Sequence, residues 1–287
     1  MHWQTTRFRI DLSRPQVMGI VNITPDSFSD GGSHADTRSA LAHCEQLLKD
    51  GADILDLGAE STRPGAVQVP VAQELARLLP VLREAVKLGV PLSVDSYKPR
   101  VMQAALDLGA DIVNDIWALR WQDAADPLDG HEVVAGHPAC GVCLMHMHGE
   151  PRTMQVSPMA GDVLPAVSSF LAEVAQDLRV RGVAPERIVL DPGIGFGKTV
   201  AQNFSLLAHQ GELLGLGYAL LAGWSRKSSL GAVAGPRPGS TGPVGQHERM
   251  APSIAAALLA VERGAAIVRV HDVRETVQAL QVLAAIK

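Results

Sequence analysis

The sequence is poor in cysteine, in aromatic residues and in long apolar runs. Its three cysteines, Cys44, Cys140 and Cys143, are odd in number and too few for a disulfide framework, which favours a reducing compartment. No apolar run approaches the ~20 residues of a membrane span. The first segment, MHWQTTRFRIDLSRP, also lacks the apolar core of a signal peptide. We therefore expect a cytoplasmic protein.

Positive charge is also scarce. Lys and Arg number 25 against 30 Asp and Glu, so the formal net charge is -5. This balance argues against nucleic acid and against an anionic membrane surface as partners. Basic residues that matter for function should therefore act locally.

Glycine, in contrast, is abundant and marks a recurring pattern. An amphipathic helical segment is followed by Gly and then by a short apolar strand. The clearest copies contain Gly51, Gly109 and Gly264, and looser copies contain Gly89, Gly182 and Gly217. Each of these glycines is typical of a helix that ends in the left-handed conformation.

These repeats predict six strands, and two more are expected at residues 17–22 and 141–145. Eight strand–helix units with right-handed crossovers close as a (β/α)8 TIM barrel, a fold that typically needs about 250 residues. We predict one such domain over residues 1–287, with residues 1–15 as an N-terminal extension. An open doubly wound sheet is the alternative, because periodicity does not show closure.

Four segments between the strands carry further expectations. Residues 71–88 and 201–214 are predicted to be amphipathic helices, the second with Phe204, Leu207 and Leu214 on one face. Residues 120–137 are only weakly helical, and the Gly/Pro-rich residues 234–246 should form a mobile loop. Residues 246–263 form an Ala/Leu helix that faces either the core or a dimer partner.

Polar and charged residues follow every predicted strand. They are Asn22, Glu60 to Gly65, Asp95, Asn114 and Asp115, His146 and His148, Asp191, Ser225 to Ser228, and Arg269 with His271. Buried strands that end in such groups are unfavourable unless the groups meet a ligand or one another. In parallel α/β folds ligands bind at these carboxyl ends, so we expect an active site there.

Eight motifs, in this order, resemble those of the dihydropteroate synthase family. They are MGIVNITPDSFSDGG, DILDLGAESTRPGA, SVDSYKP, VNDI, LMHMHGEPRTMQ, LDPGIGFGK, GWSRKSSLG and VRVHDVRET. The resemblance implies a (β/α)8 barrel that joins 6-hydroxymethyl-7,8-dihydropterin pyrophosphate to 4-aminobenzoate, giving 7,8-dihydropteroate and pyrophosphate in folate biosynthesis. It also implies a homodimer and a sulfonamide target. Ala59 and Trp224 depart from the family pattern and are expected to affect loop packing at the pocket mouth.

The resemblance assigns residues to the diphosphate. Mg2+ is the expected cofactor, with the side-chain oxygen of Asn22 as its protein contact. Asp26 and Asp30 are weaker candidates. Arg63, Arg269 and His271 would supply charge-assisted contacts to the phosphates.

The pterin and the aminobenzoate are assigned to other strand ends. Asp191, Asn114 and Lys227 match hydrogen-bonding groups on a pterin edge, with Met145 nearby. Asp95 would stabilise positive charge as the carbon–oxygen bond breaks. Arg269 would also stack on the pterin face. The positions that match the family's aminobenzoate contacts are Thr62, Pro64, Phe196, Lys227 and Ser228.

Other interpretations are weaker. A pterin-binding methyltransferase barrel would share Asn114 and Asp191, and a catalytically inactive pterin-binding paralogue is the third possibility. A phosphate-binding loop at residues 193–199 would need Gly where Pro192 stands. A zinc site built from Cys140, Cys143, His146 and His148 conflicts with the alternation of side chains along a single strand.

Overall fold

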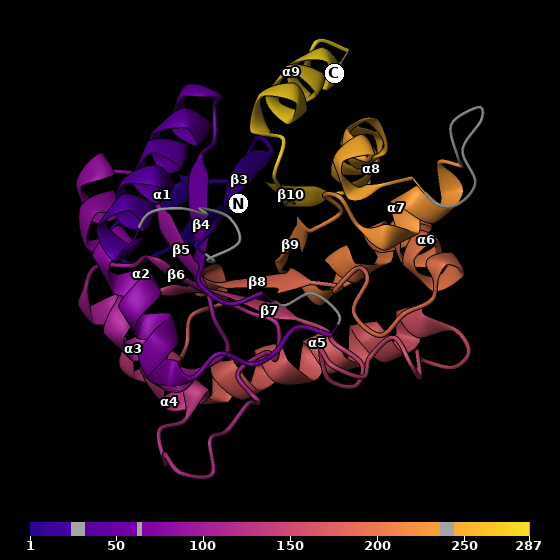
Figure 1. The fold of residues 1–287 in the computed structure, drawn as a ribbon. Helices are drawn as coiled ribbons and strands as arrows, with labels where there is room; N and C mark the ends of the chain where they lie inside the picture. The colour runs from indigo at the N-terminus through magenta and orange to yellow at the C-terminus, as the bar shows by residue number, and fades with distance from the viewer. Residues whose placement is uncertain (24–31, 62–64, 236–243, 287) are drawn as a thin grey trace.

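The computed structural model describes residues 1–23, 32–61, 65–235 and 244–286. It contains a β1–β2 antiparallel pair and a closed barrel in the order β10-β3-β4-β5-β6-β7-β8-β9. The strands are β1 His2–Gln4, β2 Arg9–Asp11, β3 Gln16–Asn22, β4 Ile54–Gly58, β5 Leu92–Asp95, β6 Ile112–Asp115, β7 Gly141–Met145, β8 Ile188–Asp191, β9 Ala219–Ala222 and β10 Ala265–Val270. Figure 1 shows the barrel strands surrounded by the helices. The predicted TIM barrel is confirmed, and the open sheet is excluded because β10 pairs with both β9 and β3.

The helices follow the strands as expected, with corrections at their ends. They are α1 Gly32–Lys49, α2 Val71–Ala85, α3 Pro99–Asp107, α4 Gly130–Gly136, α5 Val163–Val180, α6 Val200–Ala208, α7 Ser228–Val233, α8 Met250–Glu262 and α9 Val273–Ala284. The predicted helix 71–88 turns into a 3-10 helix at Val86–Leu88. The helix predicted for 201–214 was too long, since α6 ends at Ala208 and a 3-10 helix covers Gln210–Leu216. Leu214 is consequently 42% exposed and does not share the buried face of Leu207.

The six glycines of the repeated pattern all have positive φ, which confirms the predicted left-handed termini. Gly264 shows a second reason for the residue, because a Cβ there would lie 2.5 Å from Leu214 Cδ1. Each of these six turns follows a helix and redirects the chain into the next strand.

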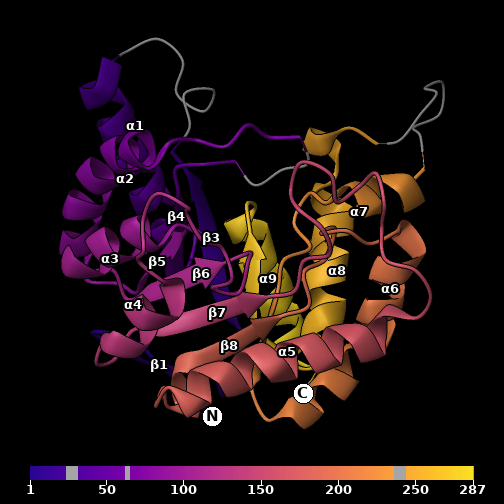
Figure 2. The ribbon, with the colours of Figure 1, turned by 90° about the horizontal axis from the view of Figure 1, so that it is seen from below.

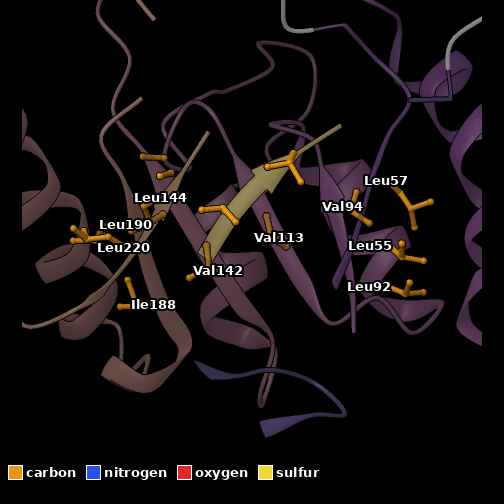
Figure 3. Close-up of a cluster of buried hydrophobic side chains, with 14 of the residues drawn as sticks. Leu55, Leu57, Leu92, Val94, Val113, Val142, Leu144, Ile188, Leu190 and Leu220 are labelled. Atoms are coloured by element: carbon orange, nitrogen blue, oxygen red, sulfur yellow. The ribbon is translucent and has the colours of Figure 1, made fainter. Parts of the chain in front are cut away.

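Side chains of the barrel strands alternate between two environments. Outward-facing residues such as Leu55, Val142 and Leu190 pack against the helices (Figure 3). Inward-facing residues in the lower half of the barrel, among them Met18 and Ile112, form a separate apolar cluster. Inward-facing residues one step nearer the carboxyl ends are mostly polar, so the same strands build both a core layer and a site.

Residues 1–15, expected to be a simple extension, contribute to the core of the barrel. Trp3 on β1 is fully buried in the lower cluster, and its Nε1 donates a hydrogen bond of 2.9 Å to the Arg187 carbonyl. The Asp111 carboxylate also holds this segment, since its Oδ2 accepts a hydrogen bond of 2.6 Å from Arg7 Nη2. In Figure 2, β1 and the N-terminus lie at the lower end of the barrel. The segment therefore closes the end opposite the polar layer.

We expect Trp3→Ala to lower the free energy of unfolding by about 3–5 kcal/mol, because it leaves a cavity and an unpaired carbonyl. Equilibrium unfolding in urea measures this change. Val282→Ala, at a position 70% exposed on α9, is the matched control and should change stability by less than about 0.5 kcal/mol. Equal unfolding midpoints for the two variants would contradict the assigned role of Trp3.

Candidate active site

A cavity of about 400 Å³ opens at the carboxyl ends of the barrel strands. It is lined by every predicted site residue that lies in the described part of the chain. These are Asn22, Asp95, Asn114, Met145, Asp191, Phe196, Lys227, Ser228, Arg269 and His271. Barrel closure brings them together from seven strands and the loops that follow. Arg63, Thr62 and Pro64 lie outside the described residues, as do Asp26 and Asp30.

The Arg269 guanidinium is held between two carboxylates. Its Nε donates to Asp56 Oδ2 at 2.6 Å, and its Nη2 donates to Asp95 Oδ2 at 2.6 Å. Asn114 Nδ2 also donates to Asp56 Oδ2, at 3.3 Å. Asp56 thereby connects the predicted diphosphate-binding and pterin-binding residues.

Asp56 is the main site residue that sequence reasoning missed. It is fully buried, and its Oδ1 atom has no hydrogen-bond partner among the described residues. One signal was present in the sequence: Asp56 interrupts the apolar run of β4, Ile54–Gly58, at an inward-facing position. A buried carboxylate in the middle of a strand requires a charged or hydrogen-bonding partner, which Arg269 supplies.

Burial changes the protonation of the charged residues in the cavity. It raises the pKa of Asp95 to about 7, and the nearby charge of Asp56 adds to this effect although Arg269 opposes it. Burial also raises the pKa of Asp191, and the hydrogen bond from the Gly193 N–H opposes this rise. The pKa of Lys227 falls to about 8, again mainly through burial. Ionisation in this cavity therefore changes near neutral pH.

The loop after β8 is packed closely against the end of β7. Gly193 has a φ of 69°, and a Cβ at this residue would lie 1.8 Å from the His146 carbonyl oxygen. Lys198 Nζ donates to the carbonyls of His146, Gly193 and Phe196 at 3.3, 2.8 and 3.1 Å. Lys198 thus stabilises its own loop, a different arrangement from a phosphate-binding loop, whose Lys reaches a ligand.

This loop also places Phe196 beside Lys227. Lys227 Nζ lies 4.3 Å from the centroid of the Phe196 ring, which is a cation–π contact. Asp191 Oδ1 accepts from the Gly193 N–H at 2.7 Å, so the carboxylate is oriented by the loop that follows it. An apolar ring, a cation and a carboxylate therefore stand around one part of the cavity.

Two side-chain pairs join the loop after β9 to the loop after β10. Ser225 Oγ accepts from the His271 backbone N–H at 3.1 Å and lies 2.9 Å from His271 Nδ1. Arg226, which has a φ of 58°, makes a two-point ion pair with Asp272, with Nη2 to Oδ1 at 2.6 Å. No local sequence pattern indicates these pairs, whose members lie 46 positions apart. They fix Lys227 relative to His271.

The two residues that depart from the family pattern, Ala59 and Trp224, do not face the cavity. Ala59 is buried in the outer apolar cluster. Trp224 is also buried, with its ring centroid 5.3 Å from that of Phe204 on α6. Neither residue lines the cavity. Both residues belong to the packed layer behind the cavity lining, and their effect on the pocket mouth stays a prediction.

The Cys140–His148 segment distributes its side chains in different directions. Cys143 points into the lower apolar cluster, whereas Cys140 Sγ lies 3.2 Å from Arg187 Nη2. The His146 ring packs edge-on against Phe170 at 5.0 Å, and burial lowers its pKa to about 3. His146 therefore has the surroundings of a structural histidine.

Comparisons with known proteins agree with this geometry. The pterin binding enzyme family matches residues 18–271. The dihydropteroate synthase of Neisseria meningitidis serogroup B is 48% identical over 285 residues, covering 98% of this chain and 95% of that protein. The Burkholderia cenocepacia dihydropteroate synthase complexed with 7,8-dihydropteroate is similar with a TM-score of 0.85 and 48% identity, covering 99% of this chain and 96% of that one. The Yersinia pestis dihydropteroate synthase with a sulfonamide drug complex gives a TM-score of 0.89 at 41% identity, covering 100% and 99%. The chain belongs to the pterin-binding enzyme family, as one of its dihydropteroate synthases.

Proposed function

We propose that the residues of this cavity carry out the dihydropteroate synthase reaction. The bond from the pterin methylene carbon to the diphosphate oxygen breaks, and the amine nitrogen of 4-aminobenzoate forms a bond to the same carbon. The main support is that ten residues predicted to lie at the ends of different strands line one cavity. The aromatic amine is already neutral at pH 7, so a strong general base and a covalent nucleophile are unnecessary.

The departing diphosphate is assigned to the side of the cavity formed by β3 and β10, which are neighbours in the barrel. Arg269 and His271 supply cationic or N–H donors there, with Arg63 as a further candidate. Ser225 Oγ already accepts from the His271 backbone, so its hydroxyl hydrogen can be donated to Nδ1. In this tautomer the His271 proton is on Nε2, which can donate a hydrogen bond to a phosphate oxygen.

Mg2+ is the proposed cofactor, with Asn22 as its protein contact. Asn22 offers an amide oxygen at the cavity, beside the residues of β10. The described residues contain no group of three or more His, Cys, Asp or Glu suited to a metal. This donor set fits Mg2+, which keeps several waters and uses one or two protein ligands together with substrate phosphates. When bound, the ion would neutralise charge on the leaving diphosphate.

The pterin is assigned to the deeper residues. The Asp191 carboxylate can accept from two N–H donors of the ring edge, while Asn114 both donates and accepts and Lys227 donates to a ring carbonyl or nitrogen. Met145 would pack on the ring, and Arg269 would stack on its face. Asp95 is assigned to stabilise the positive charge that develops at the methylene carbon.

The aminobenzoate is assigned to the outer part of the cavity. Phe196 would pack against its ring, and Ser228 at the exposed start of α7 would lie near its carboxylate. Thr62 and Pro64 are further candidates. A sulfonamide drug is present in the Yersinia pestis structure, and we propose that this chain is a sulfonamide target as well.

We also infer the setting in which the enzyme works. Exposed apolar side chains on α7 and α8, among them Val233, Met250 and Leu259, support a homodimer formed through these helices. Three buried free cysteines support a reducing cytoplasm. No helix among the described residues is long and apolar enough to cross a membrane. The whole chain, residues 1–287, is taken as one barrel domain.

Pyrophosphate release in a coupled assay with both substrates tests the proposal directly. We expect turnover that depends on Mg2+ and that falls roughly 100- to 1,000-fold in kcat/KM in Lys227→Ala, because a buried donor to the pterin is lost. Lys87→Ala is the matched control, since Lys87 is exposed and forms a surface ion pair with Glu84. Near-wild-type turnover by folded Lys227→Ala would refute the role of Lys227.

The assignment of Asp191 predicts a substrate-specific effect. Asp191→Asn loses one charged acceptor, so KM for the pterin substrate should rise roughly 10- to 100-fold while KM for 4-aminobenzoate changes less than about twofold. Steady-state kinetics with each substrate varied in turn measures both constants. Equal increases in the two KM values would count against the assignment.

Asp56 and Asp95 together predict a pH effect. Asp95 must be ionised to act and has a pKa near 7, so kcat/KM should fall as the pH drops below about 7. In Asp56→Asn a nearby negative charge is removed and Arg269 pairs with Asp95 alone. Both changes lower the pKa of Asp95, so the acid limb should move to lower pH while kcat/KM falls roughly 10- to 100-fold.

Ser93→Ala is the control for this experiment. Ser93 stands opposite Asp56 in the β4–β5 register and is likewise buried, but it carries no charge. The other charged groups that act on Asp95, namely Glu74, Asp115 and Lys227, are unchanged in both variants. The same shift of the acid limb in both variants would show that packing rather than charge is responsible.

A further inference from the structure

A second cavity, of about 330 Å³, adjoins the first and shares Glu60 and Ser61 with it. None of the described residues that line it is assigned above to a substrate or to Mg2+. Its walls come from the loops after β4, β5, β6 and β7. The lining includes Tyr97, Trp117, Arg120, Trp121, Glu150 and Arg152. The cavity is therefore a distinct space on the same rim of the barrel.

This cavity concentrates the scarce aromatic residues of the chain. The sequence contains only four Trp and two Tyr, and three of these six line this one space. The Tyr97 ring centroid lies 5.2 Å from that of Trp121, edge-on, and 6.4 Å from that of Trp117. Both Trp side chains are only partly buried, so ring surface remains accessible in the cavity. Such surfaces favour a flat ring as ligand.

The rings are held in place by the surrounding structure. Asp115 accepts from the backbone N–H groups of Trp117 at 2.8 Å and Leu119 at 2.6 Å. Between Trp117 and Trp121 the backbone has φ values of 51° at Ala118 and 65° at Leu119, an unfavourable conformation for residues other than glycine. Strain of this kind persists where the surroundings enforce it, often at ligand sites.

Tyr97 is fixed from the other side of the cavity. Its hydroxyl donates to Glu60 Oε1 at 2.8 Å. Glu60 is in turn paired with buried Lys98, which also donates to Glu74 Oε2 at 2.5 Å. Lys98 therefore shares one positive charge between the Glu60 and Glu74 carboxylates, and this network holds Tyr97 at the cavity wall.

An exposed guanidinium in the lining can meet an anionic ligand. Arg152 is exposed at the rim, and within the described parts of the chain its side chain makes no hydrogen bond or ion pair. Arg120 adds a second guanidinium, whose Nε donates to the Trp117 carbonyl at 3.0 Å. Among the described lining residues, the carboxylates are those of Glu60 and Glu150. The lining charges therefore balance. The Arg120 guanidinium lies over the Phe170 ring, 4.6 Å from its centroid, so Arg152 is the guanidinium that would receive an anion.

We propose that this second cavity binds a small flat aromatic carboxylate, with its ring on Trp117 and Trp121 and its carboxylate at Arg152. The ring contributes stacking area, and the guanidinium contributes a charge-assisted hydrogen bond. The proposal does not depend on the synthase reaction, because none of the described lining residues is assigned to that reaction.

Fluorine NMR of the full chain labelled with 5-fluorotryptophan tests the proposal, with 1-naphthoate as probe and 1-naphthamide as its uncharged counterpart. Single Trp→Phe variants assign the four resonances. We expect saturable shifts at Trp117 and Trp121 but not at buried Trp3 and Trp224, with the acid binding about tenfold more tightly than the amide.

Substitutions separate the two contributions to binding. Arg152→Gln should reduce the affinity for the acid to that for the amide, whereas Arg83→Gln, at an exposed position on α2, should not. Trp121→Ala should weaken both ligands about tenfold. Phe196→Ala, in the first cavity, should retain the full response.

Three outcomes would overturn the proposal. They are the absence of saturable shifts at Trp117 and Trp121, equal affinity for acid and amide in the unmodified chain, and loss of the response in Phe196→Ala with retention in Trp121→Ala. The last outcome would place the probe in the first cavity. Because Arg152 is exposed, its variant keeps the test valid even if Trp121→Ala fails to fold.

Discussion

The pairing of Arg269 with Asp56 and Asp95 is the interaction on which the polar layer of this barrel depends. Each of these groups would be strongly unfavourable if buried alone, and removal of one partner from a buried ion pair typically destabilises a protein by about 3–5 kcal/mol. The three residues come from β10, β4 and β5, so they meet only because the barrel closes. Closure and charge compensation therefore support each other, and the substrate cavity lies where they coincide.

The same strands carry an apolar layer one step below. Met18, Ile54, Ile112 and Ile267 fill the lower interior, and Trp3 from the N-terminal segment packs against them. The side-chain period of two makes this division possible, since an inward position near the start of a strand is apolar and the next inward position is polar. Stability is thus concentrated at one end of the barrel and chemistry at the other.

Contacts within the protein hold the loops after β8, β9 and β10 in place. Lys198 secures the loop after β8 through three carbonyls, and the Ser225–His271 and Arg226–Asp272 pairs connect the last two loops. Preorganised donors of this kind are effective in catalysis because little rearrangement is needed as charge develops. The strained conformations at Arg226 and at Ala118 lie in the same rim, where tertiary contacts hold them.

Local sequence patterns were sufficient for the strand positions, the glycine-terminated helices and the polar residues at strand ends. They succeeded because turn chemistry and side-chain alternation act over a few residues. The resemblance to dihydropteroate synthases added the roles proposed for Asn114, Asp191 and Lys227. Closure of the barrel, by contrast, was inferred from the repeated pattern, and only the pairing of β10 with β3 established it.

Tertiary structure decided what depends on residues far apart in the sequence. The partners of Asp56 lie 58 and 213 positions away, at Asn114 and Arg269. Trp3 reaches Arg187 across 184 positions, and no local pattern identifies either contact. The apolar periodicity likewise continues to Leu214, although α6 ends at Ala208 and a 3-10 helix follows it. The sequence by itself thus specified which segments carry core and polar residues, whereas barrel closure determined which of those residues meet, because it alone brings distant strand ends together.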